Sequence, residues 1–90
     1  MSEYLKYFSQ QLNFEYPKIK ITEEYFFINH YGGESEKVFL GYQAETKFNG
    51  KKYIIKSKES REDAEYLLCK EIIDKEDLVI KMLMQLTNKF

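Results

Sequence analysis

The stretch Phe48–Ile73, FNGKKYIIKSKESREDAEYLLCKEII, contains the turn, the strand and the helix start that decide the fold. Asn49-Gly50 is the strongest short hairpin signal, because both residues accept the positive φ of a two-residue type I′ turn. Such a turn fixes which residues of the two flanking strands face each other. The pairs predicted in this way are Phe48 with Lys51, Thr46 with Tyr53, and Ala44 with Ile55.

The second half of this stretch predicts a helix over residues 61–73. At Ser60 the spacing of apolar residues changes from two to about 3.6, and Ser60 with Asp63 has the pattern of a capping box. The apolar residues that follow lie on a single helical face. They are Ala64, Leu67, Leu68 and Ile72.

Upstream of the turn, residues 38–48 alternate between large and more polar side chains, which predicts a strand. With the register above, one sheet face should carry Val38, Leu40, Tyr42, Ala44, Phe48, Tyr53 and Ile55. The other face should carry Glu45, Lys47, Lys52 and Lys56. Segment 32–37, GGESEK, has turn composition and separates this strand from an earlier one.

The earlier strand is predicted mainly at residues 25–31, where aromatic and β-branched residues gather. Residues 18–22 either lead into it or form a long loop. The N-terminal segment 3–13 is predicted to be a helix, because its apolar residues recur at spacings of three and four.

The C-terminal segment predicts a further amphipathic helix at residues 75–88. Asp74 and Asp77 repeat the capping pattern, and a single helix over 61–88 would be about 42 Å long, more than so small a domain can cover. We therefore expect a break near Asp74. The fold class predicted from all segments is α+β: α-β-β-β-α with a three-stranded antiparallel sheet covered on one face by helices, plus an extra C-terminal helix. We expect one domain over residues 1–90, with its core at about 3–73.

Composition excludes several function classes. The net charge of −1 argues against a strong general attraction to nucleic acid, and Arg61 is the only arginine among 14 basic residues. With His30 the only histidine and Cys69 the only cysteine, no nucleophilic or metal-binding constellation is evident, and Cys69 is expected to be a small buried hydrophobe. We expect a soluble intracellular protein, cytoplasmic or nuclear, that is not an enzyme and needs no cofactor, metal or small-molecule substrate.

The order of elements and several short motifs resemble the double-stranded RNA-binding domain. Ser60-Arg61-Glu62-Asp63-Ala64-Glu65 is similar to that family's S-K-K-x-A-K at its second helix, and Asn49-Gly50 lies at the family's usual spacing upstream of Ala64. Helix residues Leu5, Phe8 and Gln10 are similar to its L-x-x-Y-x-Q. Tyr42, Ala44 and Thr46 are similar to its F-x-V-x-V strand. The resemblance covers residues 3–73.

Domains of this family bind the shape of A-form RNA through three surfaces, the last of which uses lysines at the start of the second helix. Here those lysine positions hold Arg61, Glu62 and Glu65, so two cations have become anions beside the RNA backbone. If RNA binding is retained, the resemblance implies contacts from Gln10, Ser35, Lys37, Lys58 and Arg61. We rank weak, shape-selective binding of double-stranded RNA below a role in protein binding.

The first hypothesis is therefore a non-catalytic interaction module of an RNA-processing or RNA-silencing complex, acting by docking to a protein partner or as a homodimer. Family members without RNA contacts often pair through the third strand and second helix. Here that resemblance, with the C-terminal stripe, points to an interface of Tyr53, Ile55, Leu67, Leu78, Val79, Met82, Leu83 and Leu86. A third reading, ranked low, is a small phage-type inhibitor of a host protein.

Overall fold

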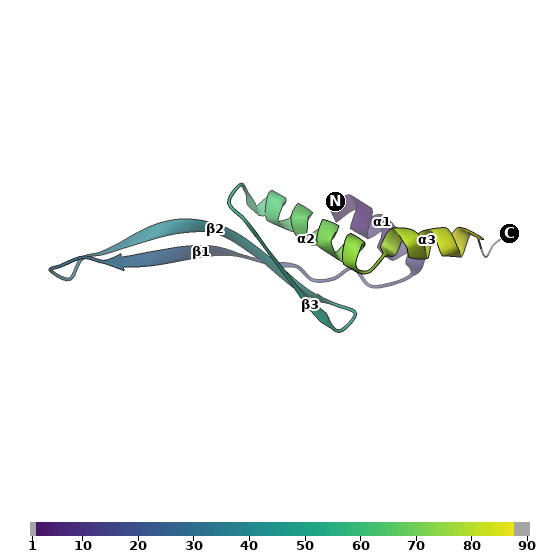
Figure 1. Ribbon diagram of the computed structural model, residues 1–90, viewed down its shortest axis with the longest axis horizontal. Helices are drawn as coiled ribbons and strands as arrows, with labels where there is room; N and C mark the ends of the chain where they lie inside the picture. The colour runs from purple at the N-terminus through teal and green to yellow at the C-terminus, as the bar shows by residue number, and fades with distance from the viewer. Residues whose placement is uncertain (1, 88–90) are drawn as a thin grey trace.

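The computed structural model describes residues 2–87 and contains three helices and a three-stranded sheet (Figure 1). The elements in chain order are α1 (Ser2–Leu12), β1 (Lys20–Asn29), β2 (Ser35–Phe48), β3 (Lys51–Ser57), α2 (Arg61–Lys75) and α3 (Leu78–Thr87). The predicted α+β class and the extra C-terminal helix are confirmed. The predicted end of that helix at residue 88 lies outside the described residues. None of the described helices is long and apolar enough to cross a membrane.

The sheet is antiparallel in the order β1-β2-β3, with β2 in the centre. The hairpin register predicted from Asn49-Gly50 is confirmed at all three pairs, and both turn residues have positive φ, 54° and 77°. Two strands are longer than predicted. Segment 20–22 belongs to β1, and β2 begins at Ser35 rather than Val38, because the turn occupies only residues 30–34.

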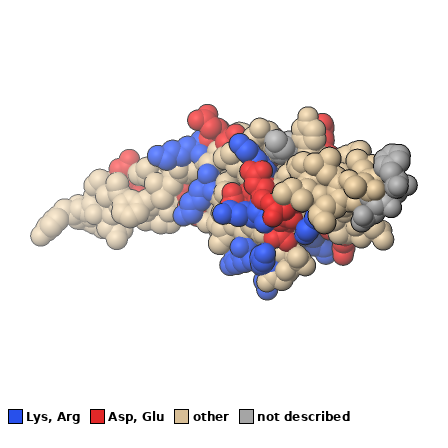
Figure 2. All heavy atoms as spheres, turned by 45° about the vertical axis from the view of Figure 1, so that its right-hand side comes forward, with Lys and Arg blue, Asp and Glu red and all other residues tan. Residues whose placement is uncertain are grey.

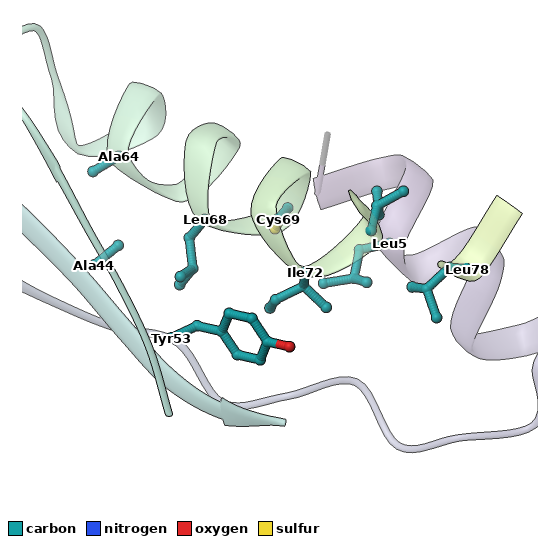
Figure 3. Close-up of a cluster of buried hydrophobic side chains, with 9 residues drawn as sticks. Leu5, Ala44, Tyr53, Ala64, Leu68, Cys69, Ile72 and Leu78 are labelled. Atoms are coloured by element: carbon teal, nitrogen blue, oxygen red, sulfur yellow. The ribbon is translucent and has the colours of Figure 1, made fainter. Parts of the chain in front are cut away.

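Helix α2 lies across β2 and β3, and the core forms between them (Figure 3). Helices α1 and α3 pack beside α2 and against each other, and α1 contributes the fully buried Leu5. The buried hydrophobic residues are Leu5, Ala44, Tyr53, Ala64, Leu68, Cys69, Ile72, Ile73 and Leu78. Aromatic residues Phe14 and Tyr16, from the segment between α1 and β1, pack against this cluster and close its open side.

The start of α2 is capped as predicted, since the Ser60 hydroxyl accepts a hydrogen bond from the Asp63 backbone N–H at 2.9 Å. Its end differs from the prediction. The helix continues past Asp74 to Lys75, and the break with α3 lies at Asp77, which has a left-handed φ of 51°. Aspartate is one of the few residues that tolerates this conformation, so it can end one helix and reorient the next.

The α2–α3 junction is held to the β2–β3 hairpin by one buried carboxylate. The side chain of Glu76 accepts hydrogen bonds from the Tyr53 hydroxyl at 2.6 Å, Asn49 Nδ2 at 3.1 Å and Lys51 Nζ at 3.2 Å. The Tyr53 hydrogen bond, followed by those from Asn49 and Lys51, lowers the pKa of Glu76 despite its burial. Desolvation, then the bond to Glu76, raises the pKa of Tyr53 to about 12.

The molecule is elongated, because β1 and β2 continue far beyond the rest of the fold (Figure 1). Its extents are 73 × 23 × 16 Å and its radius of gyration is 18.0 Å, whereas a compact chain of this length would have about 12 Å. Strand β3 pairs with β2 only from Tyr42 to Phe48. The two-stranded ribbon that remains, residues 25–40, is called the arm below.

The arm begins at a β-bulge that corrects one sequence prediction. The β1–β2 register shifts between Glu24 and Tyr25, so that Glu24 pairs with Gly41, Tyr25 pairs with Phe39, and Leu40 is the extra residue. The shift reverses the alternation along β2. Val38 and Leu40 were predicted on the face of Tyr42; instead Phe39 is on that face, with its ring 5.1 Å from the Tyr42 ring.

Replacing the buried carboxylate should destabilise the fold in a pH-dependent way. In Glu76→Gln the amide NH₂ group would face hydrogen-bond donors. We therefore expect the free energy of unfolding to fall by about 1–3 kcal/mol at pH 7. The folded pKa of Glu76 lies below its ordinary value of 4.5. Its stabilisation is therefore complete above that pH and disappears as the pH falls through the folded pKa. Urea unfolding at several pH values should show the two proteins converging in acid.

The matched control is Glu59→Gln, since Glu59 is exposed and its side chain makes no hydrogen bond or ion pair with residues 2–87. It should change stability by no more than about 0.5 kcal/mol. Equal stability of Glu76→Gln and the wild type at pH 7 would show that the carboxylate is not a structural anchor.

Gly41 should be intolerant of a side chain. A Cβ there would lie 2.8 Å from the Ser57 carbonyl oxygen, and the φ of 147° is rarely adopted by other residues. We expect Gly41→Ala to lower the free energy of unfolding by about 1–3 kcal/mol. In a domain of this size each kcal/mol lowers Tm by about 4–8 °C. Gly33→Ala is the control, because Gly33 also has positive φ but has open space around it. Similar Tm values for the two variants would exclude the close approach at Gly41 as the reason for glycine.

Candidate functional site

The arm exposes large apolar side chains on both of its faces. Successive residues of a strand point to opposite sides, and here neither side is covered by a helix (Figure 1). Phe27 is 61 % exposed, Leu40 is 47 % exposed, and Tyr31 at the tip is fully exposed. The exposed large hydrophobic residues of the arm are Phe26, Phe27, Ile28, Tyr31, Phe39 and Leu40.

One face of the arm carries a row of aromatic rings that continues from the face under α2. The rings of Tyr25 and Phe39 lie 5.5 Å apart, and Phe39 contacts Tyr42 at 5.1 Å, both edge to face. A cation stands near each end of this row. Lys37 Nζ lies 3.8 Å from the centre of the Tyr25 ring, and the Arg61 guanidinium lies 5.9 Å from that of Tyr42. The row therefore stiffens the ribbon where it leaves the core.

The opposite face of the arm is formed by Phe26, Ile28 and Val38, because Phe26 pairs with Val38 and Ile28 pairs with Glu36. No aromatic contact and no ion pair among the described residues engages Phe26 or Ile28. Figure 2 shows the outer part of the arm largely free of charged atoms, whereas lysine and glutamate side chains crowd the body of the molecule. The face is thus narrow, open and apolar apart from Glu36 near the tip.

The backbone of the arm is also available for pairing. In the described part of the chain, no strand lies beside the outer edge of β2 beyond Tyr42, and β1 is an edge strand along its whole length. Near the body, Glu23 and Glu24 hold charges on the β1 edge: Glu24 pairs with Lys56 at 3.2 Å, and Glu23 pairs with Arg61 at 3.5 Å. Such charges discourage strand pairing. In the arm itself the β1 edge, Tyr25-Phe26-Phe27-Ile28-Asn29, carries no charge.

A second exposed apolar surface lies on α3, at the other end of the long axis (Figure 1). Leu78 is buried in the core, and Gln85 donates a hydrogen bond from Nε2 to the Gln11 carbonyl oxygen at 3.0 Å, which holds α3 along α1. The outer side of α3 is exposed, with Leu83 at 57 %. The exposed hydrophobic residues of this surface are Val79, Ile80, Leu83, Met84 and Leu86, and Lys81 is the only charged residue of the helix.

An open groove of about 760 Å³ lies between the segment after α1, the β2–β3 turn and the start of α3. Its floor includes Phe14 and Phe48, whose rings are 5.0 Å apart. The charged residues that line it are three lysines, Lys18, Lys47 and Lys81, and one acidic residue, Glu15. The groove separates the body from the base of α3.

The residues that the resemblance assigned to RNA are distributed over the molecule. Ser35 and Lys37 lie on the arm, and Arg61 lies at the start of α2, where its guanidinium pairs with Glu23. Gln10 is on α1, in the helical half of the molecule. Lys58 is exposed in the connection between β3 and α2. Lys37 and Arg61 are thus joined by the aromatic row, while Gln10 is separated from both along the long axis.

The predicted interface residues divide into buried and exposed groups. Tyr53 and Leu78 are core residues, and Ile55 and Leu67 are half-buried, so part of each of these last two side chains is exposed and their role in an interface stays a prediction. Met82 is also half-buried. Val79, Leu83 and Leu86 are exposed on the outer side of α3, where their role in an interface stays a prediction.

The arm residues were absent from the predicted interface, although the sequence contained a signal for them. Tyr25-Phe26-Phe27-Ile28 and Val38-Phe39-Leu40 are continuous apolar runs rather than alternating ones, and such strands need cover on both faces. The three predicted helices can cover only one face of the sheet. Strands that are apolar on both faces would therefore leave apolar side chains exposed, and this could have predicted the arm.

The chain's one cysteine, Cys69, and its one histidine, His30, lie in different parts of the molecule. Burial raises the pKa of Cys69, whose sulfur lies 3.8 Å from the Tyr16 hydroxyl, and burial together with this contact raises the pKa of Tyr16. The thiol is therefore protonated at neutral pH and closed off from solvent, as expected for a buried hydrophobe. His30 pairs with Glu36 at 3.1 Å on the arm. Within residues 2–87 no three histidine, cysteine or acidic side chains are grouped to hold a metal ion.

Comparison of the chain with protein-family models, with curated proteins and with solved structures finds no match.

The exposed apolar residues of the arm should contribute little to the stability of the fold. We expect the double variant Phe26→Gln, Leu40→Gln to change the free energy of unfolding by less than about 1 kcal/mol, since surface substitutions usually cost no more than about 0.5 kcal/mol each. Leu68→Ala in the core should instead cost about 2–5 kcal/mol. Urea denaturation at a protein concentration low enough for the chain to be monomeric measures both. A loss in the arm variant as large as that in Leu68→Ala would mean that the arm is packed within its own molecule.

Proposed function

We propose that this chain is a non-catalytic interaction module that binds protein through its arm. The observation that carries the proposal is the two-faced apolar surface of residues 25–40, which extends beyond every helix of the fold. Isolated two-stranded ribbons are marginally stable in water, and exposed apolar patches of this size commonly mark binding surfaces. A protein partner would cover the side chains and pair the free strand edges.

The chemistry of the arm favours protein over RNA. Double-stranded RNA presents phosphates and 2′-hydroxyls, which need cations and hydrogen-bonding groups. Of the charged residues between Tyr25 and Leu40, Glu34 and Glu36 are acidic and Lys37 is basic. Arg61 is already paired with Glu23, and Glu62 and Glu65 stand near it on α2. Aromatic and aliphatic anchors are instead typical of protein interfaces.

The order helix, three antiparallel strands, helix is compatible with the scaffold of a double-stranded RNA-binding domain with one helix added. This likeness supports placing the module in an RNA-processing or RNA-silencing complex, where it would act by docking or self-association. In this proposal the loop that would touch RNA in that family has become the tip of a protein-binding arm.

The test is photo-crosslinking in cells at the arm. With p-benzoylphenylalanine in place of Phe27, irradiation should give a covalent protein adduct, because the position lies inside the proposed interface. The same group in place of Lys70, on the exposed side of α2, is the matched control and should give much less. Adducts are detected as a mass shift on a denaturing gel, before and after RNase treatment.

A second measurement addresses RNA directly, with a fluorescent duplex of about 20 base pairs, longer than the ~16 that one such RNA-binding domain spans. We expect no binding tighter than about 100 µM at physiological salt, the weak end of non-specific binding. Micromolar binding that weakens steeply with salt, or RNase-sensitive adducts at Phe27, would replace protein docking by RNA binding as the function.

A further inference from the structure

Among residues 2–87, the arm and α3 are the two surfaces with the most exposed large apolar side chains, and they lie at opposite ends of the long axis (Figure 1). The sheet and α2 stand between them, so the arm cannot fold back onto α3 of the same chain without unpairing β1 and β2. Contact between the two surfaces therefore requires two molecules.

We propose that two copies of the chain associate antiparallel, with the arm of each copy lying along the outer side of α3 of the other. This inference rests on the proposed function and names the partner of the arm as a second copy. A two-fold axis perpendicular to the long axis relates the two copies. The same rotation places the arm of each copy beside α3 of the other. The assembly closes as a dimer, because both surfaces of both copies are used.

The dimensions of the two surfaces agree. From the last residue pair of β3, at Tyr42, β2 continues to Ser35 over about 24 Å, at 3.4 Å per residue. Helix α3, with 10 residues, is about 15 Å long. A ribbon of this length covers the helix from end to end.

The chemistry of the two surfaces also agrees. Exposed aromatic residues on one face of the arm, Phe27 and Phe39, would meet Leu83 and Met84, and methionine adapts well to irregular aromatic surfaces. The charged residues at this contact are Lys81 of α3 and Lys37 of that arm face, so few charges need to be desolvated. The contact is thus mainly apolar.

The area is sufficient for a stable dimer. From their exposed fractions, the six large arm residues present roughly 800 Å² over both faces of the ribbon and the five α3 residues roughly 500 Å², given side-chain areas of about 150–250 Å². One face of the arm lies against α3, so roughly half of the arm area, about 400 Å², is buried there. Because each copy contributes both surfaces, the dimer would bury roughly 1,800 Å² in total, within the ~1,200–2,000 Å² of specific, stable protein interfaces. An arm-to-arm contact alone would leave α3 exposed.

Light scattering after size exclusion tests this arrangement. The full chain should show twice the 10.9 kDa of one copy at micromolar concentration. The arm variant Phe26→Gln, Phe27→Gln and the α3 variant Leu83→Glu, Met84→Gln should each shift the mass to that of a monomer. Lys70→Glu, an exposed change on α2, is the control and should remain a dimer. Circular dichroism of each variant checks that it is folded.

Mixing the two variants distinguishes the reciprocal contact from other dimers. The arm variant keeps an intact α3 and the α3 variant keeps an intact arm, so the mixture should form a heterodimer with one of the two contacts, detected by mass at higher concentration. If the α3 variant remains a dimer, or if the mixture stays monomeric where this heterodimer is expected, the reciprocal arrangement is wrong.

The two proposals fail in different ways. A wild-type chain that stays monomeric while the Phe27 position crosslinks to a protein of another mass would overturn the second copy as partner and leave protein docking intact. A monomeric chain with no protein adduct at Phe27 would overturn both. An adduct at twice the monomer mass supports both.

Discussion

The fold depends on a carboxylate that joins its two halves. Glu76 lies where the helices change direction, and its partners Asn49, Lys51 and Tyr53 belong to the hairpin. A buried carboxylate without partners would be costly, so the helical junction and the hairpin turn stabilise each other through Glu76. This constraint orients α3 away from the sheet, closes the core at Leu78 and leaves the outer side of α3 exposed.

Local signals explain what the sequence could predict. Asn49-Gly50 determines a turn by its own backbone preferences, and Ser60 caps α2 through a hydrogen bond that spans three residues. These features need no knowledge of the rest of the chain. The bulge at Leu40 depends instead on Ser57, which passes close to Gly41 from another strand. A glycine within an alternating pattern therefore gave the wrong face for Val38 and Leu40.

The same distinction applies to the candidate surfaces. Residues of the C-terminal stripe could be found by helical spacing, but spacing does not tell inner Leu78 from outer Leu83, because that depends on where α3 crosses α1. The arm was missed because sequence patterns predict strands without saying how far neighbouring strands extend. The ending of β3 at Ser57, opposite Tyr42, leaves residues 25–40 as a two-stranded ribbon, and none of the described helices lies over it (Figure 1).

The length of the arm can change without any change to the hydrophobic core. The tip of the arm is attached to the core only through the ladder of residue pairs, so two residues added to each strand would lengthen it by about 7 Å and leave both the core register and the two faces of the arm unchanged. One residue added to each strand would lengthen it by about 3.4 Å and interchange the faces beyond the insertion. The reach of the arm can therefore change during evolution in steps that keep or reverse its facing, while the hydrophobic core keeps its sequence.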